Sequence, residues 1–100
     1  MPLVNLVGGQ GQPGWGFSHH QDHLEIAQAA SRMLGKSLQL MPLDPVSDTP
    51  QWKRQHQAMH DAMNRALGLP QGRDFTGEMN DAWHDANWRE HAAARAKLGI

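Results

Sequence analysis

Three tryptophans of this chain share one spacing to a histidine. Each is followed eight residues later by a histidine, with a histidine or an asparagine halfway between. The copies are Trp15, His19 and His23; Trp52, His56 and His60; and Trp83, Asn87 and His91. Because four residues advance an α-helix by about 400°, such a set forms a slowly drifting row on one face. The W-x3-[HN]-x3-H repeat therefore predicts helices that turn equivalent faces toward a shared neighbour.

Capping and stop residues predict where these helices begin and end, over about residues 18–34, 50–67 and 77–98. Ser18 is the expected cap of the first helix, and Gly35 ends it. The second has Pro50 near its first position and stops before Gly68. Thr76 is the candidate cap of the third. The first repeat is imperfect, because its tryptophan precedes the expected cap.

The first 17 residues differ in composition from the rest. They hold five of the ten glycines and two of the six prolines, which favours an extended arm. Residues 18–100 are long enough for one small domain. The predicted fold is therefore all-α, with a three-helix domain (18–100) preceded by an extended Gly/Pro-rich arm (1–17).

The repeat places its histidines in the stripe of each helix that is expected to pack. Apolar residues follow three and seven positions beyond the last histidine of each copy, at Ile26, Met63, Ala94, Ala30, Leu67 and Leu98. Imidazoles inside such a stripe must hydrogen-bond to one another, to Asn87 or to backbone carbonyls. This interpretation predicts a structural polar core, with no cofactor, formed by His23, His56, His60, Asn87 and His91.

A metal site is the alternative interpretation. Two histidines four residues apart on a helix can direct both rings at one ion, and two such helices supply four nitrogens. The predicted zinc ligands are His19, His23, His56 and His60, with His91 as a substitute. The Glu that directly follows the first histidine of catalytic zinc helices is absent.

Charge and motifs disfavour other classes of function. Nine Lys and Arg stand against ten Asp and Glu, so no basic surface is expected for sequence-specific nucleic-acid binding. The sequence shows no apolar run of the length of a membrane span, and it has no cysteine for a thiolate site. Neither a nucleophile motif nor a phosphate loop is present, so we expect a protein that is not an enzyme.

Four segments carry a resemblance to a known group of proteins. In order, they are "WGFSHHQDH", "PLDP", "WKRQHQAMHDAMNRALGL" and "HAAARAKLGI". From Trp15 to Ile100 this pattern resembles small uncharacterised proteins from structural gene clusters of tailed bacteriophages. The resemblance offers no catalytic residues to carry over.

The resemblance implies a non-enzymatic virion component, made in the host cytoplasm. A neck (head-to-tail junction) or tail position is favoured, and capsid decoration is a further option. The implied partners are other virion proteins, and the chain is expected to be present in multiple copies in a symmetric assembly. The alternatives are a small His-rich zinc-binding module and a cytoplasmic protein-interaction domain.

Overall fold

The computed structural model describes residues 14–41 and 45–100, and the predicted all-α three-helix fold is confirmed. Its helices are α1 (Trp15–Leu34), α2 (Pro50–Ala66) and α3 (Asp81–Leu98). The predicted arm falls mostly on residues 1–13, which lie outside the described residues. Within the described ranges, no helix has the length and apolar character needed to cross a membrane.

Helix α1 begins at Trp15 rather than at the expected cap Ser18. Gly14 holds the N-cap position with φ 88°, a left-handed conformation that glycine adopts at little cost. Ser18 is instead a buried residue of the first turn, and its backbone N–H donates to the Gly14 carbonyl at 3.3 Å. All three residues of the first repeat are therefore helical.

Helix α3 begins at Asp81, later than the predicted residue 77. The side-chain oxygen of Asn80 accepts a hydrogen bond from the Trp83 backbone N–H at 2.9 Å, which caps the first turn. Thr76 does not cap the helix; its hydroxyl and its backbone N–H both donate to the Asp74 carboxylate, at 2.6 and 2.8 Å, in a local turn.

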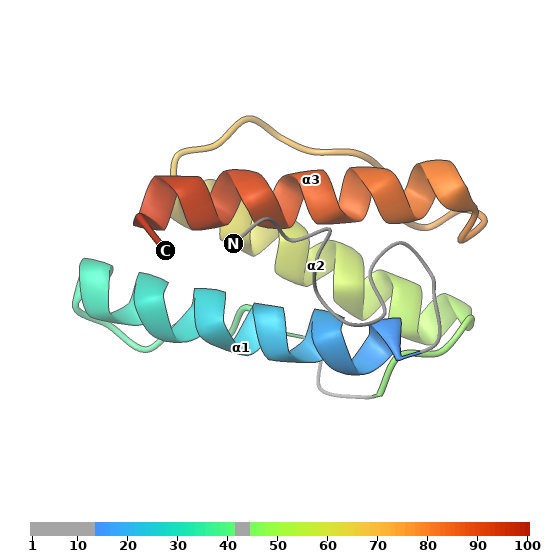
Figure 1. Ribbon diagram of the computed structural model, residues 1–100, viewed down its shortest axis with the longest axis horizontal. Coiled ribbons are helices and arrows are strands. Elements are labelled where there is room, and N and C mark those ends of the chain that lie inside the picture. Colours follow the sequence, from blue (N-terminus) through green and yellow to red (C-terminus); the bar gives the residue numbers. More distant parts are fainter. Residues whose placement is uncertain (1–13, 42–44) are drawn as a thin grey trace.

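The three helices run in the same direction, and all begin at the same end of the bundle (Figure 1). The tryptophans near their starts lie together, with ring centroids 5.8 Å apart for Trp15 and Trp83 and 6.3 Å apart for Trp52 and Trp83. The chain must therefore return along the length of the bundle before each next helix can start, and the described parts of these connections are residues 35–41, 45–49 and 67–80. Figure 1 shows residues 67–80 passing back along α3.

The parallel direction brings equivalent positions of the three repeats to the same height. In the layer after the tryptophans, the rings of His19 and His56 are 5.1 Å apart, and His56 is hydrogen-bonded to Asn87. One turn further along, ring centroids separated by 4.4 to 5.2 Å join His23, His60 and His91. The sequence repeat is thus an approximate threefold relation between helices.

Apolar residues pack on both sides of these histidine layers. Toward the helix starts, a cluster is formed by Trp52, Phe75 and Trp83. Toward the helix ends, the buried cluster contains Ile26, Ala27, Ala30, Leu40, Met63, Leu67 and Ala94. The imidazoles therefore lie between two hydrophobic clusters, where burial without partners would be costly.

Candidate metal centre

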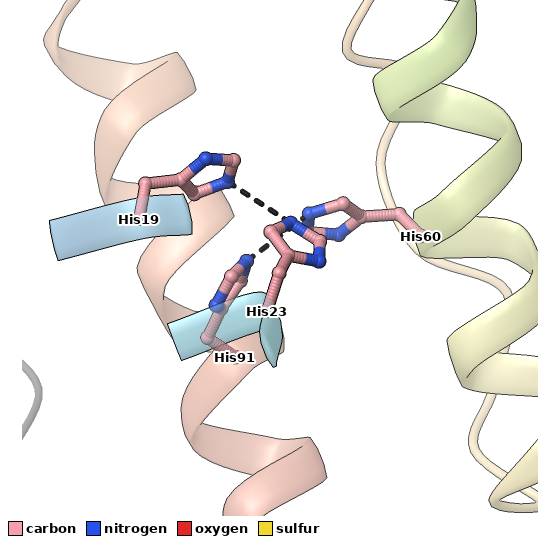
Figure 2. A group of neighbouring side chains, drawn as sticks. All are labelled: His19, His23, His60 and His91. Atoms are coloured by element: carbon pink, nitrogen blue, oxygen red, sulfur yellow. Dashed lines mark hydrogen bonds between the residues drawn. The ribbon is translucent and has the colours of Figure 1, made fainter. Parts of the chain in front are cut away.

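Four buried histidines from all three helices face a common point: His19, His23, His60 and His91. Each is at most 1% exposed, and each offers one ring nitrogen within 4.8 Å of the other three. Figure 2 shows their rings turned toward one another, two from α1 and one each from α2 and α3. Buried imidazoles that converge in this way are a ligand set suited to zinc and neighbouring transition metals.

The ring of His23 has its tautomer fixed by the backbone. Its Nδ1 lies 2.7 Å from the carbonyl oxygen of Leu40, which can only accept a hydrogen bond. Nδ1 must therefore carry the proton and donate it. The neutral ring then presents the lone pair of Nε2 to the centre.

Two carboxylates fix the rings of His91 and His60 in the same way. The Nδ1 of His91 donates to the Asp22 Oδ2 at 2.7 Å, and that of His60 donates to the Glu90 Oε1 at 3.1 Å. Both rings thus turn Nε2 inward. A metal-binding histidine commonly has its outer nitrogen on a carboxylate or a carbonyl, and this is the arrangement of all three rings.

The inward nitrogens lie at distances typical of a coordination sphere. The Nε2 atoms of His19 and His23 are 3.1 Å apart, and those of His60 and His91 are 3.3 Å apart. Unprotonated nitrogens this close repel one another unless a proton or a cation lies between them. In a tetrahedral site with zinc–nitrogen bonds of about 2.0–2.1 Å, neighbouring nitrogens lie about 3.3 Å apart. The two observed distances therefore fit edges of such a tetrahedron.

His56 is as deeply buried as the four but points elsewhere. Its ring stacks between Trp52 and Trp83, at centroid distances of 4.7 and 5.1 Å. Its Nε2 donates to the Asn87 Oδ1 at 2.9 Å, so that nitrogen has no free lone pair for an ion. Of the ligands predicted from the sequence, the structure groups His19, His23 and His60 with the substitute, His91, and not with His56.

The residues of the predicted polar core are all 0% exposed: His23, His56, His60, Asn87 and His91. Asn87 is hydrogen-bonded to His56, and the ring of His56 lies 4.2 Å from that of His60, one of the four converging histidines. The polar core and the candidate metal centre are therefore one connected group of residues.

Burial keeps the imidazoles of His19, His23 and His91 in the neutral form. It is the main cause that lowers the pKa of His19 and of His91 well below 6.5, and the nearby His23 lowers both further. Burial and the neighbouring His60 lower the pKa of His23 to about 3. Neutral imidazoles at pH 7 are the form that binds a metal ion.

The two carboxylates remain ionised near neutral pH for different reasons. Burial raises the pKa of Asp22 to about 6, although the Arg95 guanidinium, 2.7 Å away, opposes this. Burial also disfavours ionisation of Glu90, but hydrogen bonds from His60, from the Arg73 backbone and from Asn64 outweigh it and lower its pKa. Two anionic groups therefore adjoin the neutral imidazoles.

Glu90 also fastens the connection between α2 and α3 over the centre. Its Oε2 accepts a hydrogen bond from the Arg73 backbone N–H at 2.8 Å. Nearby, the Phe75 backbone N–H donates to the Gln57 side chain at 2.6 Å, and the Phe75 ring lies 4.9 Å from that of His60. The same carboxylate thus orients His60 and holds the chain that covers it.

We expect Gly72→Ala to destabilise the domain by about 1–3 kcal/mol, because a Cβ there would overlap the Glu90 carboxylate and displace it from its buried donors. Urea unfolding followed by circular dichroism measures the change. Gly77→Ala is the matched control in the same connection, where a Cβ would meet nothing within 4 Å. Equal stability of the two variants would contradict the assigned role of Glu90.

Sequence reasoning missed the oxygen partners, although the sequence carries a signal for two of them. Asp22 and Glu90 each directly precede the last histidine of a repeat, and each contacts the histidine of another helix. The equivalent residue of α2 is Met59, which has no oxygen to offer. The third ring, His23, uses the Leu40 carbonyl instead.

Comparisons of the chain with protein-family models, curated proteins and solved structures find no match. The four converging imidazoles and their oxygen partners are therefore the features that indicate a function.

Proposed function

We propose that this protein is a non-enzymatic helical domain stabilised by one transition-metal ion of the zinc class. The ligands are the Nε2 atoms of His19, His23, His60 and His91. The observation that carries the proposal is the convergence of four buried ring nitrogens within 4.8 Å, supplied by all three helices. The outer nitrogens of three rings are fixed by oxygen acceptors, which supports the same assignment.

A structural role for the ion follows from the ligand set. Four protein ligands complete a tetrahedral zinc sphere, whereas catalytic zinc sites keep one position open for water or substrate. The ligands are also closed off from solvent, at 0–1% exposure. The ion would join helices that are linked only by long connections, so its binding energy would contribute to folding.

Metal content tests the proposal. We expect untagged protein to hold close to one equivalent of metal by elemental analysis, and we expect His60→Ala to lose it. His56→Ala is the matched control, because His56 is equally buried on the same helix but turns its Nε2 to Asn87. It should retain the metal even where its stability falls.

Two results would count against this assignment. Wild-type protein that takes up no zinc or cobalt after purification in chelator would remove the metal function. Loss of metal in His56→Ala together with full retention in His91→Ala would move the site to the other histidine layer. A third substitution, His20→Ala, checks for adventitious surface binding, because His20 is exposed.

We also propose, from the resemblance of the four sequence segments, that the domain acts through protein contacts as a virion component. An exposed aromatic residue, Phe17, is 71% accessible beside a hollow lined by His20, Pro45 and Val46, and supports a role in protein contacts. Mass spectrometry of purified virions tests this role. Detection of the chain in stoichiometric amount is the expected result, and its absence from intact particles would exclude a structural place in them.

A further inference from the structure

We propose that Asp22 and Glu90 determine which ion the centre accepts, by favouring a divalent over a monovalent metal. This inference rests on the proposed metal-binding function. The two carboxylates would contact the ligands and not the ion itself. They would nevertheless determine whether the centre binds Zn²⁺ or Cu⁺ more tightly. Imidazole suits both zinc and copper, and the chain has no cysteine that would favour Cu⁺. The ligand type alone therefore leaves the choice open.

The two carboxylates lie where their charge acts on the ion. Each accepts a hydrogen bond from the outer nitrogen of a different ligand, Asp22 from His91 at 2.7 Å and Glu90 from His60 at 3.1 Å. Only one imidazole ring then separates each anion from the metal position. Asp22 is 1% exposed, so water screens its charge little.

The neighbouring charges compensate these two anions only in part. Arg95 contacts the buried Asp22 at 2.7 Å and the exposed Glu25 at 3.2 Å, so its positive charge offsets that of Asp22. Arg73 meets Glu90 through its backbone N–H, while its guanidinium donates to the Ala82 carbonyl. The two carboxylates beside the imidazoles and the one guanidinium therefore leave a net negative charge at the centre.

The attraction between each carboxylate and the bound ion is proportional to the charge of the ion, so a divalent ion gains about twice as much from it as a monovalent ion. The preference of the centre for Zn²⁺ over Cu⁺ should therefore be larger than the preference of four imidazoles without the carboxylates. Removing either carboxylate charge should reduce that preference.

The experiment compares Zn²⁺ and Cu⁺ affinities of full-length wild type, Asp22→Asn and Glu90→Gln. Competition with chromophoric chelators gives both dissociation constants, with Cu⁺ measured anaerobically. We expect each substitution to weaken Zn²⁺ binding by about 10- to 100-fold, the usual effect of losing such a partner, and Cu⁺ binding by less than about 3-fold. Asp85→Asn is the control, because Asp85 pairs with Arg89 on the surface.

Each outcome decides the inference. Equal weakening of the binding of both ions would show that the carboxylates only orient the rings, and unchanged affinity for both ions would show that they have no role in binding; either result overturns the inference and leaves the metal site in place. Wild type that binds neither ion overturns the proposed function as well. Both substitutions keep an acceptor oxygen, and circular dichroism reports folding. Should Asp22→Asn fail to fold, Glu90→Gln decides alone, since the Glu90 side chain is 15% exposed.

Discussion

Zinc added to the metal-free protein at about a thousand times its dissociation constant should raise the thermal unfolding midpoint by roughly 15–30 °C. Binding to the folded state alone contributes about 4 kcal/mol at that excess, and a domain of this length gains roughly 4–8 °C per kcal/mol. The ion would hold three helices together, because the four ligands come from all three of them. Scanning calorimetry with zinc and with a chelator gives the two midpoints.

The matched variants separate this effect from general salt or surface binding. His60→Ala should show a shift below about 2 °C at the same zinc concentration, since it lacks one of four ligands. The exposed-histidine variant His20→Ala should respond like wild type. A wild-type shift no larger than that of His60→Ala would mean that the ion contributes nothing to folding.

The metal-free domain should unfold cooperatively in mild acid, between about pH 6 and pH 4. Burial is the main cause that lowers the folded-state pKa of five histidines, and the lowering is large for four of them: His19, His23, His56 and His91. Below pH 6.5 these histidines are protonated in the unfolded chain and remain neutral in the folded chain. The free energy of unfolding therefore falls as the pH falls. Each histidine costs about 1.4 kcal/mol per pH unit in this range, or roughly 5 kcal/mol per unit together. Typical domain stabilities of about 5–15 kcal/mol are then exhausted within a few units.

Asp22 acts in the opposite direction over part of this range. Its folded pKa is raised by burial from 3.8 to about 6, so the folded state binds its proton first as pH falls from 6 to 4. This offsets the cost of about one histidine. Urea unfolding at a series of pH values should therefore show a net uptake of about three protons on unfolding near pH 5. A free energy of unfolding that stays constant from pH 7 to pH 5 would contradict the buried, neutral state of these rings.

The helix faces could be predicted from the sequence, but the direction of the helices could not. Spacing by four residues places a tryptophan and a histidine on one face, and the structure packs those faces together. The same spacing is compatible with antiparallel neighbours. Parallel helices require that the connections between them, residues 35–49 and 67–80, reach from one end of the bundle to the other. Nothing in the composition of these connections distinguishes this path from a loop that stays at one end.

This missing direction explains why the predicted ligand set had to be revised. Two histidine pairs from two helices, including His56, are the natural choice when only the spacing is known. Parallel packing instead brings the last histidines of all three repeats to one height, so His91 joins His23 and His60. His56 is drawn to Asn87, the one position where the repeat departs from histidine.

The helix starts were mispredicted because residues with similar capping ability compete locally. Thr76 and Asn80 both accept backbone hydrogen bonds well, and only Asn80 stands three residues before a tryptophan that packs into the bundle. At the first helix, Gly14 starts the helix by its conformation without any capping side chain, so composition alone pointed to Ser18.

The parallel arrangement also determines how such a chain can fold. Neighbouring antiparallel helices can pair as soon as a short turn has formed, whereas here His56 and Asn87 are 31 residues apart in the chain, and His91 and Asp22 are 69 apart. When two helices associate, a long loop closes and chain entropy is lost. This loss comes before the contacts between the helices can compensate for it. This chain should therefore assemble more slowly than most helical bundles of its length, with no stable two-helix intermediate.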